Sequence, residues 1–277
     1  MKQIVINLAI CFLPFLVAAQ ENCNVFLWQG DTAKFNACEL IQKSPKYFQL
    51  TYRHHKIRDS AIQIAPHYDY PYWSKSIAFL KTGDFVGWKQ LIDKAVNRNE
   101  LKHLGYRGWC RFQFFGDYRG AIADLDRLEA IMGTSDIGVS QNGTYHLQIA
   151  KALCHKMIGE RTEALSLIED QIAADPDFVG AFDFMHLGVL YLETGDLDKA
   201  HQSFLKQEKM NPIAENCFYQ SKLEMVRGNL ELALNYAKEA SKRYKDGQFM
   251  YDPYSHQVDK VYAVEMEELI DHLKSLL

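Results

Sequence analysis

The sequence predicts an all-α protein, a right-handed superhelical solenoid of about five helix-turn-helix hairpins with helical caps at both ends. The main observation is a turn that recurs along the chain, a glycine followed by Asp, Glu or Asn. These turns begin at Gly83, Gly116, Gly159, Gly195 and Gly228, at spacings of 33, 43, 36 and 33 residues. The spacings cluster about the 34-residue period of a repeated pair of helices.

The chemistry of these turns supports hairpins of two helices. A glycine ends the first helix because it adopts the left-handed conformation without the steric penalty of a Cβ atom. The acidic or amide residue that follows caps the second helix by accepting a hydrogen bond from a free backbone N–H group. Each turn is therefore expected to separate the two helices of one hairpin.

One unit, residues 181–212, allows a comparison with a known repeat position by position. The matching residues, at repeat positions 4, 7, 8, 11, 20, 24 and 32, are Phe184, Leu187, Gly188, Tyr191, Ala200, Phe204 and Pro212. Only position 27 departs, where Gln207 replaces a small residue. The unit resembles a tetratricopeptide repeat (TPR), and this resemblance covers residues 69–243. Over its full length the chain is also similar to exported, functionally uncharacterised TPR proteins of Gram-negative bacteria.

The other units match the repeat less completely. In the second unit Gly108 stands one position early, so Trp109 occupies the crowded position 8. In the first unit Trp88 replaces the small residue of position 20, and in the last unit Glu224 is unusual at position 11. Degenerate outer repeats are expected where the stacking of hairpins ends.

The first residues differ in character from the rest and predict a secretory signal peptide at 1–19. Lys2 is followed by a nearly apolar run, and small residues stand at positions −3 and −1 before Gln20. A retained anchor is the alternative, but an apolar run of about 15 residues is short for a bilayer span. We therefore expect an exported protein, periplasmic or extracellular and envelope-associated, with no transmembrane segment after cleavage.

The remaining organisation follows from these two assignments. Residues 20–68 are expected to form an N-terminal helical cap, residues 69–243 the TPR array and residues 244–277 a C-terminal capping helix region. The 43-residue spacing indicates a longer loop at residues 132–144, between the second and third repeats.

The cysteines predict one disulfide and no metal site. Cys23 and Cys38 are fifteen residues apart in a segment without repeat character, and a disulfide there would contribute about 3 kcal/mol in an oxidising compartment. Cys110, Cys154 and Cys217 fall in predicted helices and are expected in the core. Because Cys and His residues lack the close spacing of a metal site, we predict neither a metal nor any other cofactor.

Charge and motifs exclude several functional classes. The formal net charge is −4 and no block of Lys and Arg is present, so nucleic acid is not an expected partner. The sequence has no H-E-x-x-H, Walker-type or G-x-S-x-G motif. We therefore predict no enzymatic activity and name no catalytic residues.

The predicted function is a protein-binding scaffold or adaptor of the cell envelope. The TPR resemblance implies that the first helix of each hairpin lines a concave groove, mainly through repeat positions 2, 5, 9, 12 and 13. These positions are largely apolar, and the candidate ligand-binding residues are Trp73, Tyr106, Phe114, Ile149, Met185, Val189 and Phe218. Such a groove suits a protein partner that presents a peptide or an amphipathic helix. The groove could instead be filled by the chain itself, for example by residues 249–254 or 68–73.

A second hypothesis is a glycan-binding helical repeat protein that uses exposed aromatic side chains. Aromatic residues make up 13% of the chain, and Trp73, Trp88 and Trp109 are the candidates. The competing interpretation is that these tryptophans pack between helices.

Overall fold

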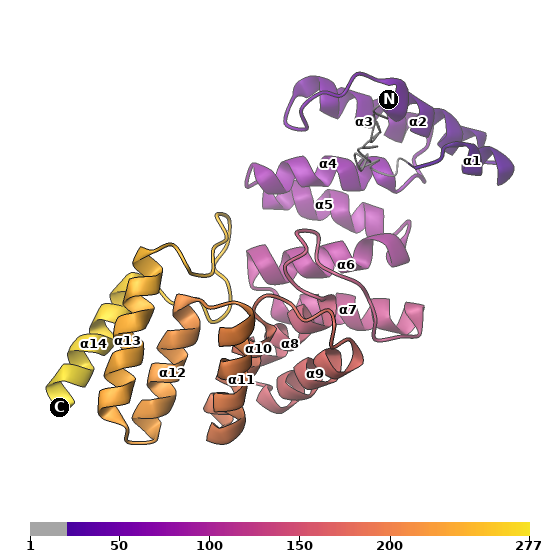
Figure 1. The fold of residues 1–277 in the computed structure, drawn as a ribbon. Coiled ribbons are helices and arrows are strands. Elements are labelled where there is room, and N and C mark those ends of the chain that lie inside the picture. The colour runs from indigo at the N-terminus through magenta and orange to yellow at the C-terminus, as the bar shows by residue number, and fades with distance from the viewer. Residues whose placement is uncertain (1–20) are drawn as a thin grey trace, which may run out of the picture. The chain divides into compact units, whose positions relative to one another are not determined.

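The computed structural model describes residues 21–277, so the predicted signal peptide at 1–19 lies outside the described residues (Figure 1). Within this range the chain is helical, with an isolated bridge between Val139 and His146 and no strand. The described residues divide into two compact units, one that ends at Arg98 and one from Asn99 to Leu277. The division falls within the predicted array 69–243, after its first hairpin.

The first unit holds the N-terminal cap and the first hairpin. Its helices are α1 (Asn24–Trp28), α2 (Thr32–Lys43), α3 (Tyr52–Ile64), α4 (Tyr70–Lys81) and α5 (Phe85–Val96). Asp31 caps α2 by accepting a hydrogen bond from the Lys34 amide at 2.9 Å, and Asp84 caps α5 through the Gly87 amide at 2.8 Å. The second of these caps is the one predicted from the turn that begins at Gly83.

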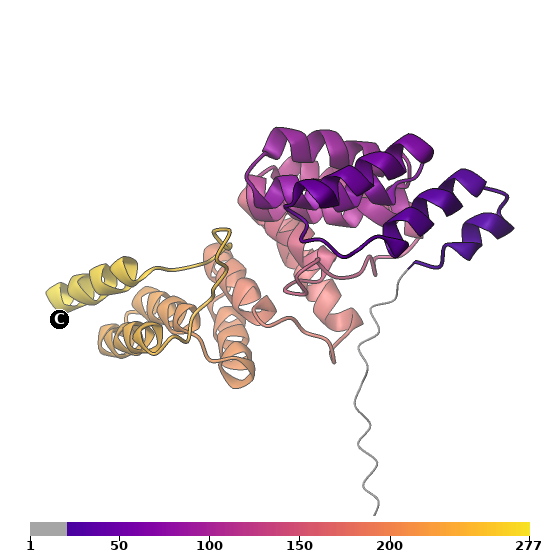
Figure 2. The ribbon, with the colours of Figure 1, turned by 90° about the horizontal axis from the view of Figure 1, so that it is seen from above.

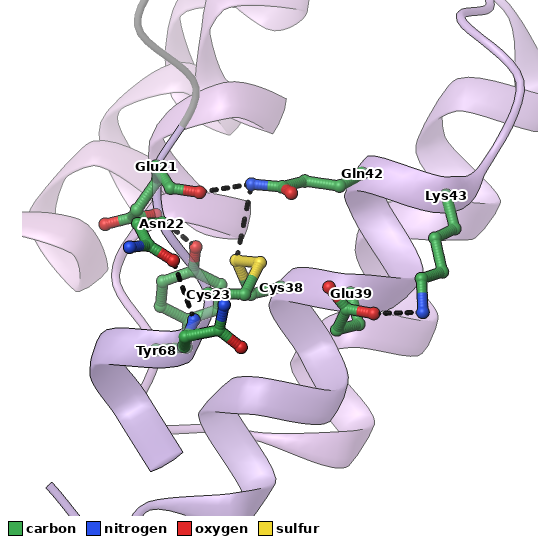
Figure 3. The surroundings of a disulfide bond; sticks show 9 residues. Glu21, Asn22, Cys23, Cys38, Glu39, Gln42, Lys43 and Tyr68 are labelled. Carbon is green, nitrogen blue, oxygen red and sulfur yellow. Dashed lines mark hydrogen bonds and ion pairs between the residues drawn. A yellow bond between two sulfur atoms is a disulfide. The ribbon is translucent and has the colours of Figure 1, made fainter. Parts of the chain in front are cut away.

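A disulfide between Cys23 and Cys38 lies inside the N-terminal cap, with the two Cα atoms 5.6 Å apart (Figure 3). Around it the Tyr68 hydroxyl donates a hydrogen bond to the Glu21 carboxylate. The ring of Tyr68 also meets that of Phe26 edge to face, with centroids 5.4 Å apart. The disulfide, α1, α2 and the end of α3 thus share one small apolar core.

The second unit contains four hairpins and the C-terminal helix. The hairpins pair α6 (Glu100–Cys110) with α7 (Tyr118–Met132), α8 (Leu147–Met157) with α9 (Arg161–Ala174), α10 (Asp183–Thr194) with α11 (Leu197–Met210), and α12 (Ala214–Val226) with α13 (Leu230–Lys245). Helix α14 (Ala263–Leu276) packs on α13. With α4 and α5 in the first unit, these pairs confirm the predicted helix-turn-helix hairpins.

The glycine turns behave largely as their sequence predicts. Gly116 and Gly195 lie in the left-handed region, with φ of 61° and 87°. Asp117 and Asp196 then cap the following helices through their side chains, at 3.0 and 3.1 Å. At the third and fifth turns the expected cap is missing, because Glu160 and Asn229 make no capping hydrogen bond with their side chains.

A π-helical turn, η1 (Arg111–Phe115), follows α6 and explains the displaced glycine of the second repeat. A π-turn takes up one residue more than an α-turn, so it shifts the residues before it by one position along the repeat. A Cβ atom on Gly108 would lie 3.1 Å from Leu125 Cγ, just as one on Gly188 would lie 2.5 Å from Phe204 Cε1. Gly108 therefore takes the crowded position of its hairpin, although it stands one residue early in the sequence.

The C-terminal cap is shorter than the predicted region 244–277. Helix α14 begins only at Ala263, and residues 246–262 form an irregular segment between α13 and α14. Figures 1 and 2 show this segment leaving the end of α13, extending away from it and returning to α14. We call residues 246–262 the crossing segment.

Candidate functional site

The candidate site is the face of the second unit that its first helices form, which we call the inner face. It is built from α6 with η1, α8, α10 and α12, the helices that line the groove of a TPR array. The crossing segment is hydrogen-bonded to residues of all four elements. The inner face therefore holds a long irregular stretch of the chain itself.

The first contact comes from the π-turn. Gln113 of η1 is buried, and its Nε2 atom donates hydrogen bonds to Ser255 Oγ at 2.6 Å and to Asp252 Oδ2 at 3.2 Å. Asp252 in turn accepts hydrogen bonds from the backbone amides of Tyr254 and Ser255, which fixes a turn of the crossing segment. The local π-turn thus places one amide side chain against the segment's middle.

The second contact is a buried ionic cluster around Asp259. Its carboxylate accepts a hydrogen bond from Lys156 Nζ of α8 at 2.6 Å and lies 2.7 Å from His186 Nδ1 of α10. The side chains of Lys156 and Asp259 are each 7% exposed and that of His186 is fully buried. The other ring nitrogen of His186 lies 3.3 Å from the hydroxyl of Tyr145.

Two opposing effects set the pKa of Asp259. Burial acts to raise the pKa of its carboxyl group, while the hydrogen bond from His186 and the charge of Lys156 act to lower it. The partners prevail, so the pKa lies below the usual value for Asp and the group is held as a carboxylate. Asp259 also has a φ of 62°, in the left-handed region that residues other than glycine rarely adopt.

The third contact is made by Glu215, in the first turn of α12. This fully buried carboxylate accepts hydrogen bonds from the Met250 amide at 3.1 Å and from Lys260 Nζ at 2.7 Å. The ammonium group of Lys260 also lies over the ring of Phe249, 4.2 Å from its centroid. A backbone hydrogen bond of 2.8 Å from the Ala214 amide to the Gln248 carbonyl completes this end of the segment.

None of the four inner-face side chains that bind the crossing segment, Gln113, Lys156, His186 and Glu215, was predicted. Counted from the turn glycine at position 15, Gln113 and Lys156 stand at position 12 of their repeats and Glu215 at position 2. These are groove positions of a TPR, so polar residues at them are the signal that could have identified the site. Their partners in the crossing segment carry no such signal, because that segment has no repeat pattern.

Four of the predicted groove residues are buried in the structure. Ile149, Met185, Val189 and Phe218 are at most 4% exposed, so they offer no surface to a ligand in this conformation. Phe218, for example, belongs to one apolar cluster with Val261 of the crossing segment and with Met266 of α14. The expectation of an open apolar groove is corrected for these four residues, because the chain's own side chains pack around them.

The other three predicted groove residues are half-buried and pack against neighbouring rings. The rings of Tyr106 and Phe114 both meet Trp109, with centroids 6.1 and 5.4 Å away. Trp73 belongs to the first unit, where its ring is 5.6 Å from that of Tyr70. Trp73 is therefore not one of the residues that form the inner face of the second unit.

The tryptophans named for glycan binding are mostly enclosed. Trp88 and Trp109 are buried in their hairpins, and Trp73 is half-buried. Sugar recognition by exposed tryptophan faces is therefore not supported at Trp88 or Trp109.

An open hollow lies beside the crossing segment. It has a volume of about 430 Å³ and is lined by the loops around residues 142–146 and 178–182, together with Tyr251, Asp252 and Gln257. Phe178 and Tyr251 are exposed at this hollow. The crossing segment thus forms one wall of the accessible space on this side of the unit.

Within residues 21–277, no helix has the length and apolar character needed to cross a bilayer. In the same range, His, Cys, Asp and Glu side chains form no group of three suited to a metal ion.

Comparison with known proteins shows similarity in structure. No protein-family model and no curated protein sequence matches the chain. The structure of PilW, a type IV pilus biogenesis factor, is 14% identical with a TM-score of 0.55, over 80% of this chain and 90% of PilW. PilF of Pseudomonas aeruginosa is 11% identical with a TM-score of 0.54, over 80% of this chain and 89% of PilF.

A longer structure is similar as well. A chain of the APC/C hetero-tetramer Cut9–Hcn1 is 10% identical with a TM-score of 0.56, over 91% of this chain and 44% of that one. Identities this low establish the fold alone. The chain therefore has the all-helical TPR fold that its glycine spacing predicted.

Proposed function

We propose that this protein is a non-enzymatic scaffold or adaptor of the cell envelope that binds a partner protein on the inner face of residues 99–277. Its TPR fold supports a binding role, because such stacked hairpins present extended surfaces to other proteins. The signal-like residues 1–19 and the disulfide between Cys23 and Cys38 support export, because disulfides persist in oxidising compartments. PilW, which shares the fold, is a type IV pilus biogenesis factor, in keeping with an envelope role.

The observation that carries the proposal is that the inner face already holds a polypeptide segment without helix or strand. Polar side chains of η1, α8 and α12, namely Gln113, Lys156 and Glu215, bind the crossing segment in one fixed register. A surface that orders seventeen residues of its own chain, 246–262, has the geometry that peptide recognition requires.

The partner's point of entry is the hollow beside the crossing segment. Phe178 and Tyr251 stand exposed at its edge, and aromatic side chains of this kind are enriched at protein interfaces. A partner that inserts an apolar side chain into the hollow would contact Tyr251 and Gln257, and hence the crossing segment itself. We therefore expect an extended peptide of a partner protein to bind along this side of the unit.

Site-specific photo-cross-linking in the producing cell tests the proposal. A photoreactive amino acid is placed at Tyr251 and, as a matched control, at Tyr52 in the first unit, because the two side chains are 72% and 75% exposed. We expect a discrete protein adduct from position 251, diminished by Phe178→Ser, and none from position 52. Equal adducts from both positions, or none from 251, would contradict binding at the inner face.

A further inference from the structure

We propose that the crossing segment is an intramolecular ligand of the inner face, and that a partner segment of the same chemistry replaces it. That chemistry is an irregular chain segment with a carboxylate directly followed by an ammonium group, as in Asp259-Lys260. The inference rests on the proposed function and specifies what the partner must present.

The length and order of the segment are the first argument. Loops of more than about 12–15 residues without secondary structure are uncommon in compact domains, and those that are ordered are usually functional. Residues 246–262 are such a loop, yet Met250, Gln257, Val258 and Val261 are buried. The chain therefore uses an unusually long connection to cover a surface that a shorter turn between α13 and α14 would leave open.

The way the segment is held is the second argument. Its contacts with η1, α8 and α10 are made by side chains, namely those of Gln113, Lys156 and His186. A backbone hydrogen bond joins it to the inner face at its start, from Ala214 to Gln248. Detaching the segment would therefore break side-chain contacts while the hydrogen bonds within the helices remain.

Both ends of the segment stay attached when its middle leaves the face. Helix α14 packs on α13, and its Met266, Leu269 and Leu273 share one apolar cluster with Ala233 and Ala237. Seventeen residues, if fully extended, reach at most about 60 Å, which is enough for the segment to leave the inner face while both helices stay in place. Release therefore requires no unfolding of a hairpin.

The charges on the inner face define the ligand that fits. Lys156 and His186 receive a carboxylate, and Glu215 receives an ammonium group and a backbone amide. Buried ion pairs add little net stability, because loss of hydration offsets their attraction, but a wrong partner leaves a charge unpaired. These ionic contacts thus add little to the affinity of the inner face for a ligand. They determine instead the order of charges that the ligand must have.

The conformation of Asp259 agrees with an exchangeable ligand. Among the described residues, Asp259 is the only one other than glycine with a positive φ. This conformation is unfavourable for an L-amino acid. A partner segment without this constraint would make the same ionic contacts with less strain. Competition with the tethered segment is then possible, although the tether gives that segment a high effective concentration.

Hydrogen exchange of the unaltered mature protein is the first test, because it needs no variant. We expect amides of residues 248–260 to exchange at least about tenfold faster than those of α10 and α12, as for a local opening. If the segment exchanges only as slowly as these helices, it opens only on global unfolding and the inference is overturned.

Peptide exchange is the second test, with a fluorescent peptide of residues 246–262 added to the full chain. We expect Asp259→Asn in the protein to raise its affinity for the peptide about tenfold, because the competing internal segment is weakened. Asp259→Asn in the peptide, or Lys156→Met in the protein, should abolish this gain. The matched control is Glu267→Gln on α14, an exposed carboxylate that pairs with Lys245 and should change nothing.

The outcomes separate this inference from the proposed function. If the protein with Asp259→Asn binds the peptide no better than the unaltered protein, replacement of the segment is wrong. A partner adduct at position 251 would still stand in that case. Binding of the peptide without any cellular adduct would instead support the intramolecular ligand and contradict the scaffold role.

Discussion

The two ends of this chain are closed by different chemistry. In the first unit a disulfide joins Cys23 to Cys38, fifteen residues apart, and ties α1 to α2. In the second unit Asp259 reaches back to His186 and Lys156, which are 73 and 103 residues away. One closure is covalent and local, and the other is ionic and spans most of its unit.

The difference shows how each closure contributes to the structure. A disulfide stabilises chiefly by restricting the unfolded chain, and it does so whatever the surrounding side chains are. A buried ionic cluster adds little net stability but fixes which residues meet, because each charge needs its counterpart. The N-terminal cap is therefore held by a covalent bond. The crossing segment is held in one register by ionic contacts, which can break and re-form.

The largest expected effect is on the ionic closure. Lys156→Met leaves the buried Asp259 carboxylate without its ammonium partner, so the free energy of unfolding of the second unit should fall by about 3–5 kcal/mol. Urea denaturation followed by regional hydrogen exchange measures it. Lys199→Met, which removes an exposed pair with Asp196, is the control and should cost about 1 kcal/mol or less.

A second substitution in the same cluster sharpens this result. Adding Asp259→Asn to Lys156→Met removes both charges and should restore part of the lost stability. A double variant as unstable as the sum of the two single variants would argue against a coupled ion pair.

The covalent closure has the next largest expected effect. Cys23→Ser with Cys38→Ser should lower the free energy of unfolding by about 3 kcal/mol, as expected for a 15-residue loop, and only in residues 21–98. Reductant should act on the same region, because the disulfide lies there and Cys110, Cys154 and Cys217 of the second unit are free thiols. Faster exchange in α10 or α12 under reduction would contradict this separation.

A smaller effect on the free energy of unfolding is expected at the π-turn, which positions Gln113 against the crossing segment. Gly108→Ala places a methyl group 3.1 Å from Leu125 Cγ, so stability should fall by about 1–3 kcal/mol through overpacking. Ala123→Ser on the exposed face of α7 is the control and should stay within about 0.5 kcal/mol. A neutral Gly108→Ala would show that Gly108 does not occupy the crowded position of its hairpin.

The smallest effect concerns pH and separates the two closures directly. Because the pKa of Asp259 is lowered in the folded protein, its stabilisation is present above about pH 4 and is lost as the pH falls through the folded pKa. Each pKa unit corresponds to about 1.4 kcal/mol. The stability difference between the unaltered protein and Asp259→Asn should therefore narrow below pH 4 in denaturation curves, whereas the effect of the disulfide should not change with pH. A difference that stays constant to pH 3 would exclude this role for Asp259.

Local features of the sequence determined the hairpins. Glycines such as Gly195, which must be left-handed, and caps such as Asp196 act within a few residues, so their spacing alone predicted where helices pair. The match of residues 181–212 to a TPR has the same local origin.

Only the tertiary structure decided what lies on the inner face. Apolar residues such as Met185 and Phe218 have the same pattern whether a ligand or the chain itself covers them, so the sequence left both outcomes open. The outcome depends on Asp259 meeting Lys156 and His186 across 103 and 73 residues, and on the π-turn that turns Gln113 toward Ser255. Helix periodicity records contacts within a few turns, whereas pairing of single charges so far apart leaves no periodic trace in the sequence.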